Sequence, residues 1–248
     1  MSNLELVLQE GERLDDLHRK GYRIIQNPRY FSFGMDAVLL SAFAKVHKNE
    51  KHMDFCCGNG IVPILLAAKC AGASYCGMEI QEPLADMAMR SVALNGLEDK
   101  IRIIHGDIRK AAGILGHGTF DVITVNPPYM AAGSGFENED SPMAIARHEI
   151  MCNLEDVAIS AAKLLRFGGR LYMVHRPGRL ADIVFTLRKH GLESKILRFV
   201  QSKIGEGPNT LLIMAAKGGK VHLNVEKPLI VYDEQGKYTQ EVYEIYYE

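Results

Sequence analysis

Short apolar runs alternate with helical patterns from His52 onward, and this alternation limits the possible folds more than any other feature of the 248-residue chain. Repeated strand and helix units form a mostly parallel sheet with helices on both faces. A turn that contains Gly and Pro joins the last two runs, so the last strand is expected to be antiparallel. The expected fold class is therefore α/β, with a seven-stranded, mostly parallel sheet. The expected strands cover residues 53–57, 74–80, 101–105, 120–125, 170–175, 194–202 and 209–216.

The sheet and its helices are expected to form one domain, residues 31–218. A charged N-terminal extension, residues 1–30, precedes this domain, and an acidic tail, residues 219–248, follows it. Within the domain, residues 130–150 form a long polar loop with several glycines, and loops of this length are usually functional or disordered. The expected helices begin near Met35 or Asp36 for the first and cover about 61–71, 83–94, 154–165 and 178–190 for the others.

The composition is that of a soluble globular protein, with 47% hydrophobic and 24% charged residues. No apolar run is long enough to span a bilayer, and the N-terminus has no signal-peptide pattern, so the cytoplasm is expected. The five cysteines form no Cys-x-x-Cys pair and have no accompanying His ligand spacing. No metal site is therefore expected.

Charge is distributed unevenly along the chain. Residues 147–220 carry 13 Lys/Arg against 6 Asp/Glu, whereas residues 1–146 carry 14 against 18. A basic segment of this kind is typical of a protein that contacts a polyanion, although a solvated basic face explains the numbers about equally well.

A glycine-containing turn follows the first expected strand, in the sequence Asp54-Phe-Cys-Cys-Gly58-Asn-Gly60. Such glycines allow a sharp turn and let a ligand lie against bare backbone. A dinucleotide fingerprint would need Gly or Ala at position 63, which is Pro63 here. The chain also has no Gly-Lys-Ser/Thr phosphate loop. A ligand held by its pyrophosphate is therefore not expected.

Acidic residues follow the next two strands, at Glu79 and Asp107. The Glu79 carboxylate can accept hydrogen bonds from ribose hydroxyls, and that of Asp107 from an adenine amino group. In open parallel sheets, ligands bind beyond the carboxyl ends of the strands. Singly, each acid is more often a helix cap or a surface charge, but their order on successive strand ends favours one common site.

The fourth expected strand ends in Asn126, Pro127, Pro128 and Tyr129. Proline lacks an N–H and fixes φ, so this turn is stiff and its carbonyls stay free to accept hydrogen bonds. If the Asn126 side-chain oxygen and the Pro127 carbonyl each accept one N–H of an amine, they hold the nitrogen lone pair toward an electrophile and stabilise the charge that develops on it. Tyr129 would stack on an unpaired or flipped-out base.

This order of residues resembles the class I S-adenosylmethionine-dependent methyltransferases, which have a Rossmann-like fold, over about residues 31–216. With the segments 33–40 and 146–149, the chain is similar to the bacterial family that methylates the adenine 6-amino group beside the anticodon of tRNA(Val). The segment 175–179 has a counterpart in the Gram-positive branch of that family. One departure is Cys56-Cys57, where many relatives carry a small residue and glycine.

The resemblance implies roles for particular residues. The implied binding residues for S-adenosylmethionine are Phe33, Asp36, Asp54, Gly58, Gly60, Glu79, Asp107 and Asn126. The implied catalytic residues, which hold the target amine, are Asn126, Pro127, Pro128 and Tyr129. Arg147, His148, Arg176 and Arg179 are candidate RNA-binding residues, and solvation is the likelier explanation for any one of them taken singly.

Two other enzymatic functions use the same Asn-Pro-Pro-Tyr chemistry. A protein glutamine methyltransferase is disfavoured because the chain has no separate N-terminal helical domain, and the basic segment favours RNA. A guanine-modifying rRNA methyltransferase is disfavoured by the tyrosine and by the short chain. A protein that binds RNA without catalysis is least favoured, since no residue of the set is missing. The oligomeric state is left open.

Overall fold

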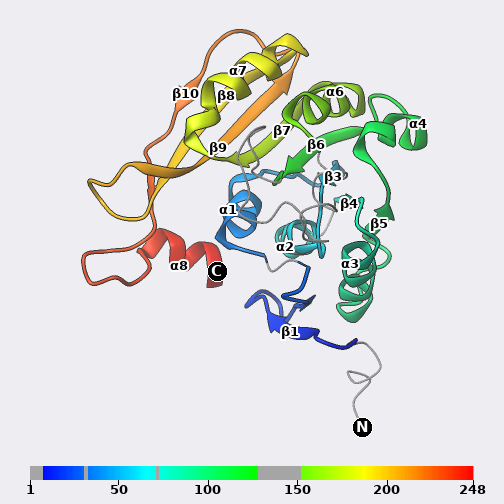
Figure 1. Ribbon diagram of the computed structural model, residues 1–248. Coiled ribbons are helices and arrows are strands. Elements are labelled where there is room, and N and C mark those ends of the chain that lie inside the picture. Colours follow the sequence, from blue (N-terminus) through cyan, green and yellow to red (C-terminus); the bar gives the residue numbers. More distant parts are fainter. Residues whose placement is uncertain (1–7, 31–32, 71–72, 128–151, 248) are drawn as a thin grey trace, which may run out of the picture.

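The computed structural model describes residues 8–30, 33–70, 73–127 and 152–247 (Figure 1). Its centre is a twisted sheet in the order β10-β8-β9-β7-β6-β3-β4-β5, with β11 paired to β8. The seven expected strands are all present, and β9 is antiparallel to both of its neighbours. They are β3 (Lys51–Phe55), β4 (Ser74–Glu79), β5 (Ile101–His105), β6 (Phe120–Val125), β7 (Leu165–His175), β8 (Leu192–Gln201) and β9 (Pro208–Lys217).

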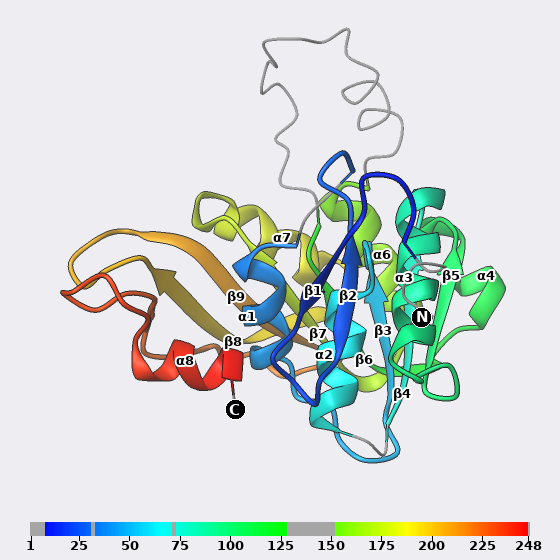
Figure 2. The same ribbon diagram turned by 90° about the horizontal axis from the view of Figure 1, so that it is seen from below.

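Helices cover both faces of the sheet, as the alternating pattern predicts (Figures 1 and 2). One face packs on α1 (Met35–Phe43), α2 (Ile61–Lys69), α3 (Glu82–Leu94) and α8 (Gln240–Tyr247), and the other on α4 (Ala111–Leu115), α6 (Leu154–Leu164) and α7 (Leu180–Lys189). Side chains alternate between the two layers along each strand. On β7, for example, Tyr172 and Val174 belong to the first apolar layer, and Leu171 and Met173 to the second. The α/β fold with a mostly parallel sheet is therefore confirmed.

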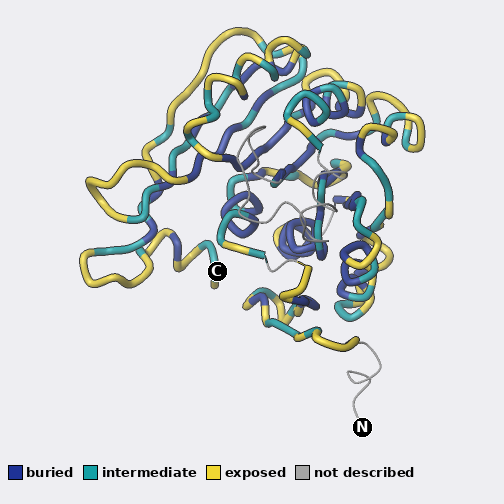
Figure 3. Tube along the Cα trace, in the orientation of Figure 1, coloured by how far each residue is buried: buried dark blue, intermediate teal, exposed yellow. Residues whose placement is uncertain are grey.

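The central strands and α2 are the most buried parts of the molecule (Figure 3). Eight of the nine residues of α2 are buried, from Ile61 to Ala68. Pro63 lies in the first turn of this helix, where a missing N–H costs no intrahelical hydrogen bond. The turn before α2 is therefore held on a rigid support.

An N-terminal hairpin was not expected from the charged first segment. It consists of β1 (Arg13–Asp16) and β2 (Arg23–Gln26), which pair antiparallel. The hairpin packs on α3, where Ile25 forms a small apolar cluster with Leu84 and Met87. Its strands are short and largely polar, so these contacts rather than strand propensity hold it in place.

The start of β7 and the strands of the acidic tail also differ from the expected elements. Strand β7 begins at Leu165, directly after α6, because Leu165 pairs with Phe120 ahead of an irregularity in the ladder. The acidic tail adds β10 (Asn224–Val225) and β11 (Leu229–Ile230), both parallel to β8. It also adds α8, which contacts α1. Among the described residues, no helix is both long and apolar enough to cross a membrane.

Candidate cofactor and target site

The carboxyl ends of four adjacent parallel strands bring the main candidate residues to one edge of the sheet. Phe55 at the end of β3 is in register with Met78 of β4 and with Val125 of β6, and Glu79 is in register with His105 of β5. Asp54, Glu79 and Asp107 therefore lie on successive strand ends; we call these three residues the carboxylate edge. Asn126 follows β6 at the same edge.

The turn between β3 and α2 has the backbone that a close ligand approach requires. Gly58 and Gly60 have φ of 54° and 85°, in the left-handed region that favours glycine. A Cβ on Gly60 would lie 3.2 Å from the Ala88 Cβ, so α3 packs tightly against this turn. Cys56 has a φ of 54° as well, although it carries a side chain.

Glu79 is locked in position by backbone donors. Its Oε2 accepts a hydrogen bond from the Gly58 N–H at 2.9 Å, and its Oε1 accepts one from the Gln81 N–H at 3.0 Å. The side chain is buried, and burial raises the pKa of Glu79 against the lowering effect of these hydrogen bonds. Each carboxylate oxygen has a further lone pair, so Glu79 can still accept hydroxyl donors. This arrangement fits the ribose of a nucleoside cofactor.

A buried row of polar groups lies beneath the turn. Thr124 Oγ1 donates to Asp54 Oδ1 at 2.5 Å and is 2.8 Å from His52 Nε2. Burial raises the pKa of Asp54 to about 8 and lowers that of His52 to about 3. The Thr124 hydrogen bond opposes the rise at Asp54, whereas the Glu79 charge adds to it. Asp54 therefore holds its proton at neutral pH, and His52 stays uncharged.

The Asp107 carboxylate is already paired. It accepts hydrogen bonds from the Arg109 N–H at 2.9 Å and from Arg109 Nε at 2.8 and 3.0 Å. The Arg109 side chain is the main reason that the pKa of Asp107 lies below its ordinary value. The carboxylate is thus ionised and oriented, and its remaining lone pairs can accept an amino group.

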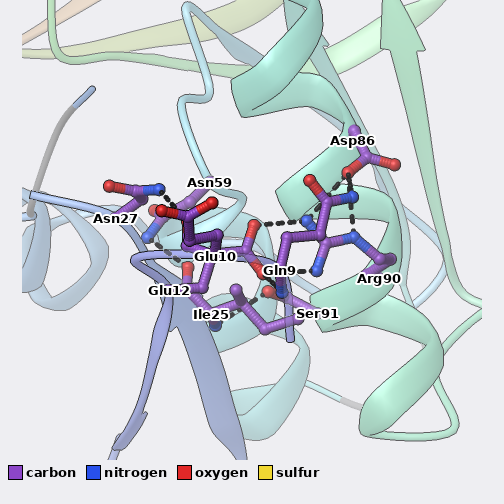
Figure 4. A network of polar contacts seen from close by, with 9 residues as sticks. All are labelled: Gln9, Glu10, Glu12, Ile25, Asn27, Asn59, Asp86, Arg90 and Ser91. Atoms are coloured by element: carbon purple, nitrogen blue, oxygen red, sulfur yellow. Dashed lines mark hydrogen bonds and ion pairs between the residues drawn. The ribbon is translucent and has the colours of Figure 1, made fainter. Parts of the chain in front are cut away.

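Asn59 is a positioning residue that the sequence analysis did not single out. It is buried within the turn, and its Nδ2 donates to the Ile25 carbonyl of β2 at 3.1 Å. Ser91 Oγ of α3 accepts from the Ile25 N–H at 3.0 Å. Arg90 completes the network through two hydrogen bonds to Glu12, at 2.5 and 2.7 Å (Figure 4). The N-terminal hairpin therefore helps to hold the turn between β3 and α2, residues 56–60, in place.

The first two residues of the Asn-Pro-Pro-Tyr segment are described. Asn126 is partly exposed at the end of β6, and Pro127 is buried. Pro128, Tyr129, Arg147 and His148 lie outside the described residues. The roles given to these six residues stay predictions.

Phe33 and Asp36 precede the carboxylate edge in the sequence and form hydrogen bonds with other elements. The Phe33 N–H donates to Gln26 Oε1 at 2.9 Å, and Asp36 Oδ1 accepts from Thr210 Oγ1 at 3.4 Å. Phe33 also lines a cavity of about 450 Å³ between the β1 turn, α1, α2 and the C-terminal tyrosines. No residue of the carboxylate edge lines this cavity. The cofactor-binding role of Phe33 and Asp36 remains a prediction.

Arg176 and Arg179 follow the carboxyl end of β7, on the same edge as Asn126. Arg176 Nη1 donates to the Asn209 carbonyl at 3.2 Å, and Arg179 Nε donates to Asp182 at 2.7 Å. His175 Nδ1 accepts from the Arg176 N–H at 2.8 Å, so the ring fixes the start of this segment. Burial, followed by the nearby arginines, lowers the pKa of His175. Among the described residues, no cluster of His, Cys, Asp and Glu forms a metal site.

The chain matches the family described as the methyltransferase small domain over residues 22–185. It is 30% identical over 199 residues to a tRNA1(Val) (adenine(37)-N6)-methyltransferase of Porphyromonas gingivalis, covering 78% of this chain and 77% of that protein. It is 25% identical to the Haemophilus influenzae protein of the same name, covering 91% and 94%.

Solved structures show the same fold. One is a "predicted O-methyltransferase" from Agrobacterium tumefaciens, with a TM-score of 0.70 and 21% identity over 85% of this chain and 95% of that one. Another is a geranyl diphosphate methyltransferase in complex with S-adenosylmethionine, with a TM-score of 0.54 and 14% identity over 74% and 84%.

The family match, together with the fold, identifies the chain as a methyltransferase that uses S-adenosylmethionine as its methyl donor. The chain belongs to the methyltransferase small domain family and, within it, to the family of the tRNA1(Val) (adenine(37)-N6)-methyltransferases. The expected enzyme class, cofactor and family are thereby confirmed.

Proposed function

We propose that this protein transfers a methyl group from S-adenosylmethionine to the exocyclic 6-amino group of an adenine in RNA, and that the RNA is tRNA(Val), modified beside its anticodon. The observation that carries the proposal is the position of Asn126-Pro127 directly after β6, beside the strand that bears Asp54. The names of the relatives in Porphyromonas gingivalis and Haemophilus influenzae support the choice of substrate.

The carboxylate edge and the turn at 56–60 hold the cofactor in this proposal. Glu79 accepts the ribose hydroxyls, Asp107 accepts the adenine amino group, and the Gly58–Gly60 backbone lies against the ligand. When bound, S-adenosylmethionine supplies a methyl group attached to a sulfonium, which is a strong electrophile. Because Glu79 is already fixed by two backbone donors, little reorganisation is needed when the hydroxyls arrive.

Asn126 and Pro127 hold the target amine. The lone pair of an arylamine is delocalised into its ring, so the nitrogen is a poor nucleophile. Acceptance of one N–H by the Asn126 side-chain oxygen and of the other by the Pro127 carbonyl directs the lone pair out of the ring plane. The same acceptors stabilise the positive charge that forms on the nitrogen. The methylated ammonium then loses a proton to water, and no strong base is needed.

RNA contacts come from Arg176 and Arg179 in this proposal, together with Arg147 and His148. The two described arginines follow β7 on the edge of the sheet that carries Asn126, so a base bound there would place its own phosphates within their range. The segment from His175 to Arg179 supports assignment of the chain to the Gram-positive branch of the family. The proposed tRNA substrate supports a cytoplasmic location.

Labelled S-adenosylmethionine tests the proposal directly. The full-length protein is incubated with bulk tRNA, rRNA and ribosomal protein fractions, and digested products are separated by mass. Label in N6-methyladenosine from tRNA is the expected result. Label in N2-methylguanosine would indicate an rRNA guanine methyltransferase, and label in a glutamine side chain would indicate a protein glutamine methyltransferase. Either result would overturn the proposed function. The matched control is Asn126→Ala, which should reduce the label in every fraction by about 10²–10³-fold.

A further inference from the structure

The sheet has an open edge at β10, in the C-terminal part of the chain. Strand β10 pairs with β8 on one side, and no other described strand pairs with it on the other (Figure 1). The chain bends at Val221, and all residues from there to Val225 are exposed. None of them has a positive φ, so an added strand could extend β10 back to the bend. We call residues 220–226 the tail segment.

The outward hydrogen-bonding groups of the tail segment belong to alternate residues. The Glu226 N–H donates to the Leu197 carbonyl of β8 at 2.8 Å. Because the backbone groups of successive strand residues point to opposite edges, the N–H and C=O of Val225 point away from β8. The same alternation turns those of Leu223 and Val221 outward. Unpaired groups of this kind are a template for another strand.

The same three residues carry apolar side chains. Val221, Leu223 and Val225 are 78%, 39% and 58% exposed. Val225 is in register with Leu197, whose side chain belongs to the apolar layer covered by α7. Side chains in register on neighbouring strands lie on the same face of a sheet, so these three lie on the face that α7 covers. An exposed apolar row on an open strand edge is typical of an association site.

The sequence of the tail segment is complementary to its own reverse. It reads Lys-Val-His-Leu-Asn-Val-Glu, with Leu223 at its centre. If two copies pair antiparallel about a two-fold axis at Leu223, the two Leu223 side chains lie opposite each other, and each Val221 lies opposite a Val225. Lys220 of each copy then lies opposite Glu226 of the other. Apolar and opposite-charge cross-strand pairs both stabilise a sheet.

The backbone favours the same register as the side chains. Leu223 with Leu223, and Val221 with Val225, would form hydrogen-bonded pairs, because their backbone groups point outward in both copies. A shift of the axis by one residue would place Val225 opposite Gly219 in one direction and Val221 opposite Lys227 in the other. Either shift also separates the opposite charges at the ends of the segment.

We propose that the tail segment is the interface of a homodimer, in which two copies pair antiparallel through residues 221–225 and form one continuous sheet. A two-fold axis requires a surface that is complementary to itself, and this segment has such a surface in its apolar centre and its charged ends. A second copy of this chain is therefore the partner. The interface is small, so we expect the dimer to be weak and its formation to depend on protein concentration.

This interface lies far from the carboxylate edge. Strands β7, β9 and β8 stand between β6 and β10, which places β10 about 19 Å from the strand that precedes Asn126, at about 4.8 Å per strand. The dimer thus needs none of the residues proposed to hold the cofactor or the target amine. Failure of this proposal would leave the proposed function intact, and the reverse is also true.

Sedimentation velocity of the full-length protein, from about 10 µM to about 1 mM, tests the dimer without cofactor or RNA. We expect the average mass to rise with concentration from one chain toward two. Leu223→Lys places two cations together at the two-fold axis and should weaken association by on the order of 100-fold. Ile204→Lys, at an apolar residue that is 81% exposed between β8 and β9, is the control and should associate as the wild type does.

Exchange of charges tests the antiparallel register. Lys220→Glu and Glu226→Lys each place like charges opposite each other at both ends of the interface, and each should weaken association by on the order of tenfold. The double variant should recover the wild-type association, and an equimolar mixture of the two single variants should form heterodimers, because opposite charges face each other again. Lys48→Glu makes the same change of charge on an exposed residue outside the interface and should have no effect.

Two sets of results would overturn the proposal. A protein that stays monomeric up to about 1 mM has no dimer of the expected strength. A dimer that Leu223→Lys leaves unchanged, or whose loss in the single charge variants is not recovered in the double variant and the mixture, is formed by another surface or in another register. Thermal unfolding checks that every variant is folded, and the exposed positions of the substitutions predict wild-type midpoints.

Discussion

The ionisable residues of the carboxylate edge and those of the basic half of the chain differ in how deeply they are buried. We call the Lys and Arg residues of 152–220 the basic half. Asp54 and Glu79 are buried, and each accepts hydrogen bonds from neighbouring strands or turns. The residues of the basic half are mostly at the surface, and six of them form ion pairs: Arg166, Arg170, Arg179, Arg188, Lys189 and Arg198.

In three of these ion pairs, the acidic partner lies outside residues 152–220. Arg166 pairs with Asp121, Arg170 with Glu50, and Arg198 with Glu241. The charge surplus counted along the sequence is therefore partly neutralised in space. Arg170 and Glu50 are both partly buried, whereas the Arg166 side chain is exposed. An exposed ion pair contributes only about 0–1 kcal/mol, so an exposed arginine such as Arg166 can exchange a carboxylate for a phosphate. Buried ionisable groups are fixed in position by the fold, whereas the exposed cations form a field whose role can be tested only with a binding partner.

The largest expected effect concerns Asn126, which belongs to neither region and which we propose to hold the target amine. Asn126→Ala removes one acceptor that stabilises charge in the transition state, and single-turnover methylation of tRNA should fall by about 10²–10³-fold. In calorimetry, S-adenosylhomocysteine affinity should fall much less than the methylation rate, because the other implied cofactor-binding residues are intact. Asn224→Ala, in the exposed two-residue strand β10, is the control and should retain the wild-type rate. Full activity of Asn126→Ala would place the target amine elsewhere.

The second prediction tests the role of the buried Glu79 side chain. Glu79→Gln keeps the size of the side chain but removes the charge that, in the proposed function, accepts the ribose hydroxyls. S-adenosylhomocysteine affinity should fall about 10- to 100-fold, as expected for hydrogen bonds to a charged group. Glu82→Gln, an exposed residue in the first turn of α3, is the matched control. If both variants bind equally well, Glu79 supports the turn and does not hold the ligand.

Sequence reasoning succeeded where a local pattern determines the structure. The strand ends expected at residues 57, 80 and 125 lie within two residues of the observed ends at Phe55, Glu79 and Val125. Parallel pairing then brings the residues that follow these strands to one edge. The hairpin β1–β2 was missed because its sequence is polar and its stability comes from Ile25 packing on α3. Asn59 was missed for the same reason, since its partner is a β2 carbonyl that no local pattern predicts.

The third prediction uses the raised pKa of Asp54. The pKa is about 8 in the folded protein against an ordinary value near 3.8. The folded state therefore holds a proton that the unfolded state releases between these values, and this residue's contribution to stability falls as pH rises from about 4 to 8. In Asp54→Asn that contribution is absent, so the stability of the variant relative to wild type should increase with pH, by at most about 1.4 kcal/mol per pH unit.

Urea unfolding of both proteins at pH 5, 6, 7 and 8 measures this difference. His52, with a pKa lowered to about 3, acts in the opposite sense, because the unfolded state gains a proton below its ordinary value of 6.5. Its effect is the same in both proteins and cancels in the comparison. A difference in stability that does not change with pH would show that Asp54 is ionised at neutral pH.

The smallest expected effect separates two arginines within the basic half. Arg179 precedes α7 next to the carboxyl end of β7, and Arg188 lies at the other end of the same helix, about 14 Å away along its axis. Both are ion-paired, with Asp182 and Glu193. If RNA lies across the edge that carries Asn126, Arg179→Gln should reduce the salt dependence of tRNA binding by one phosphate contact, a slope change of about 0.7–0.9, and Arg188→Gln should leave it unchanged. Filter binding between 50 and 200 mM salt measures both slopes. Equal changes would mean that the basic half attracts RNA through its overall field, without a defined phosphate contact at Arg179.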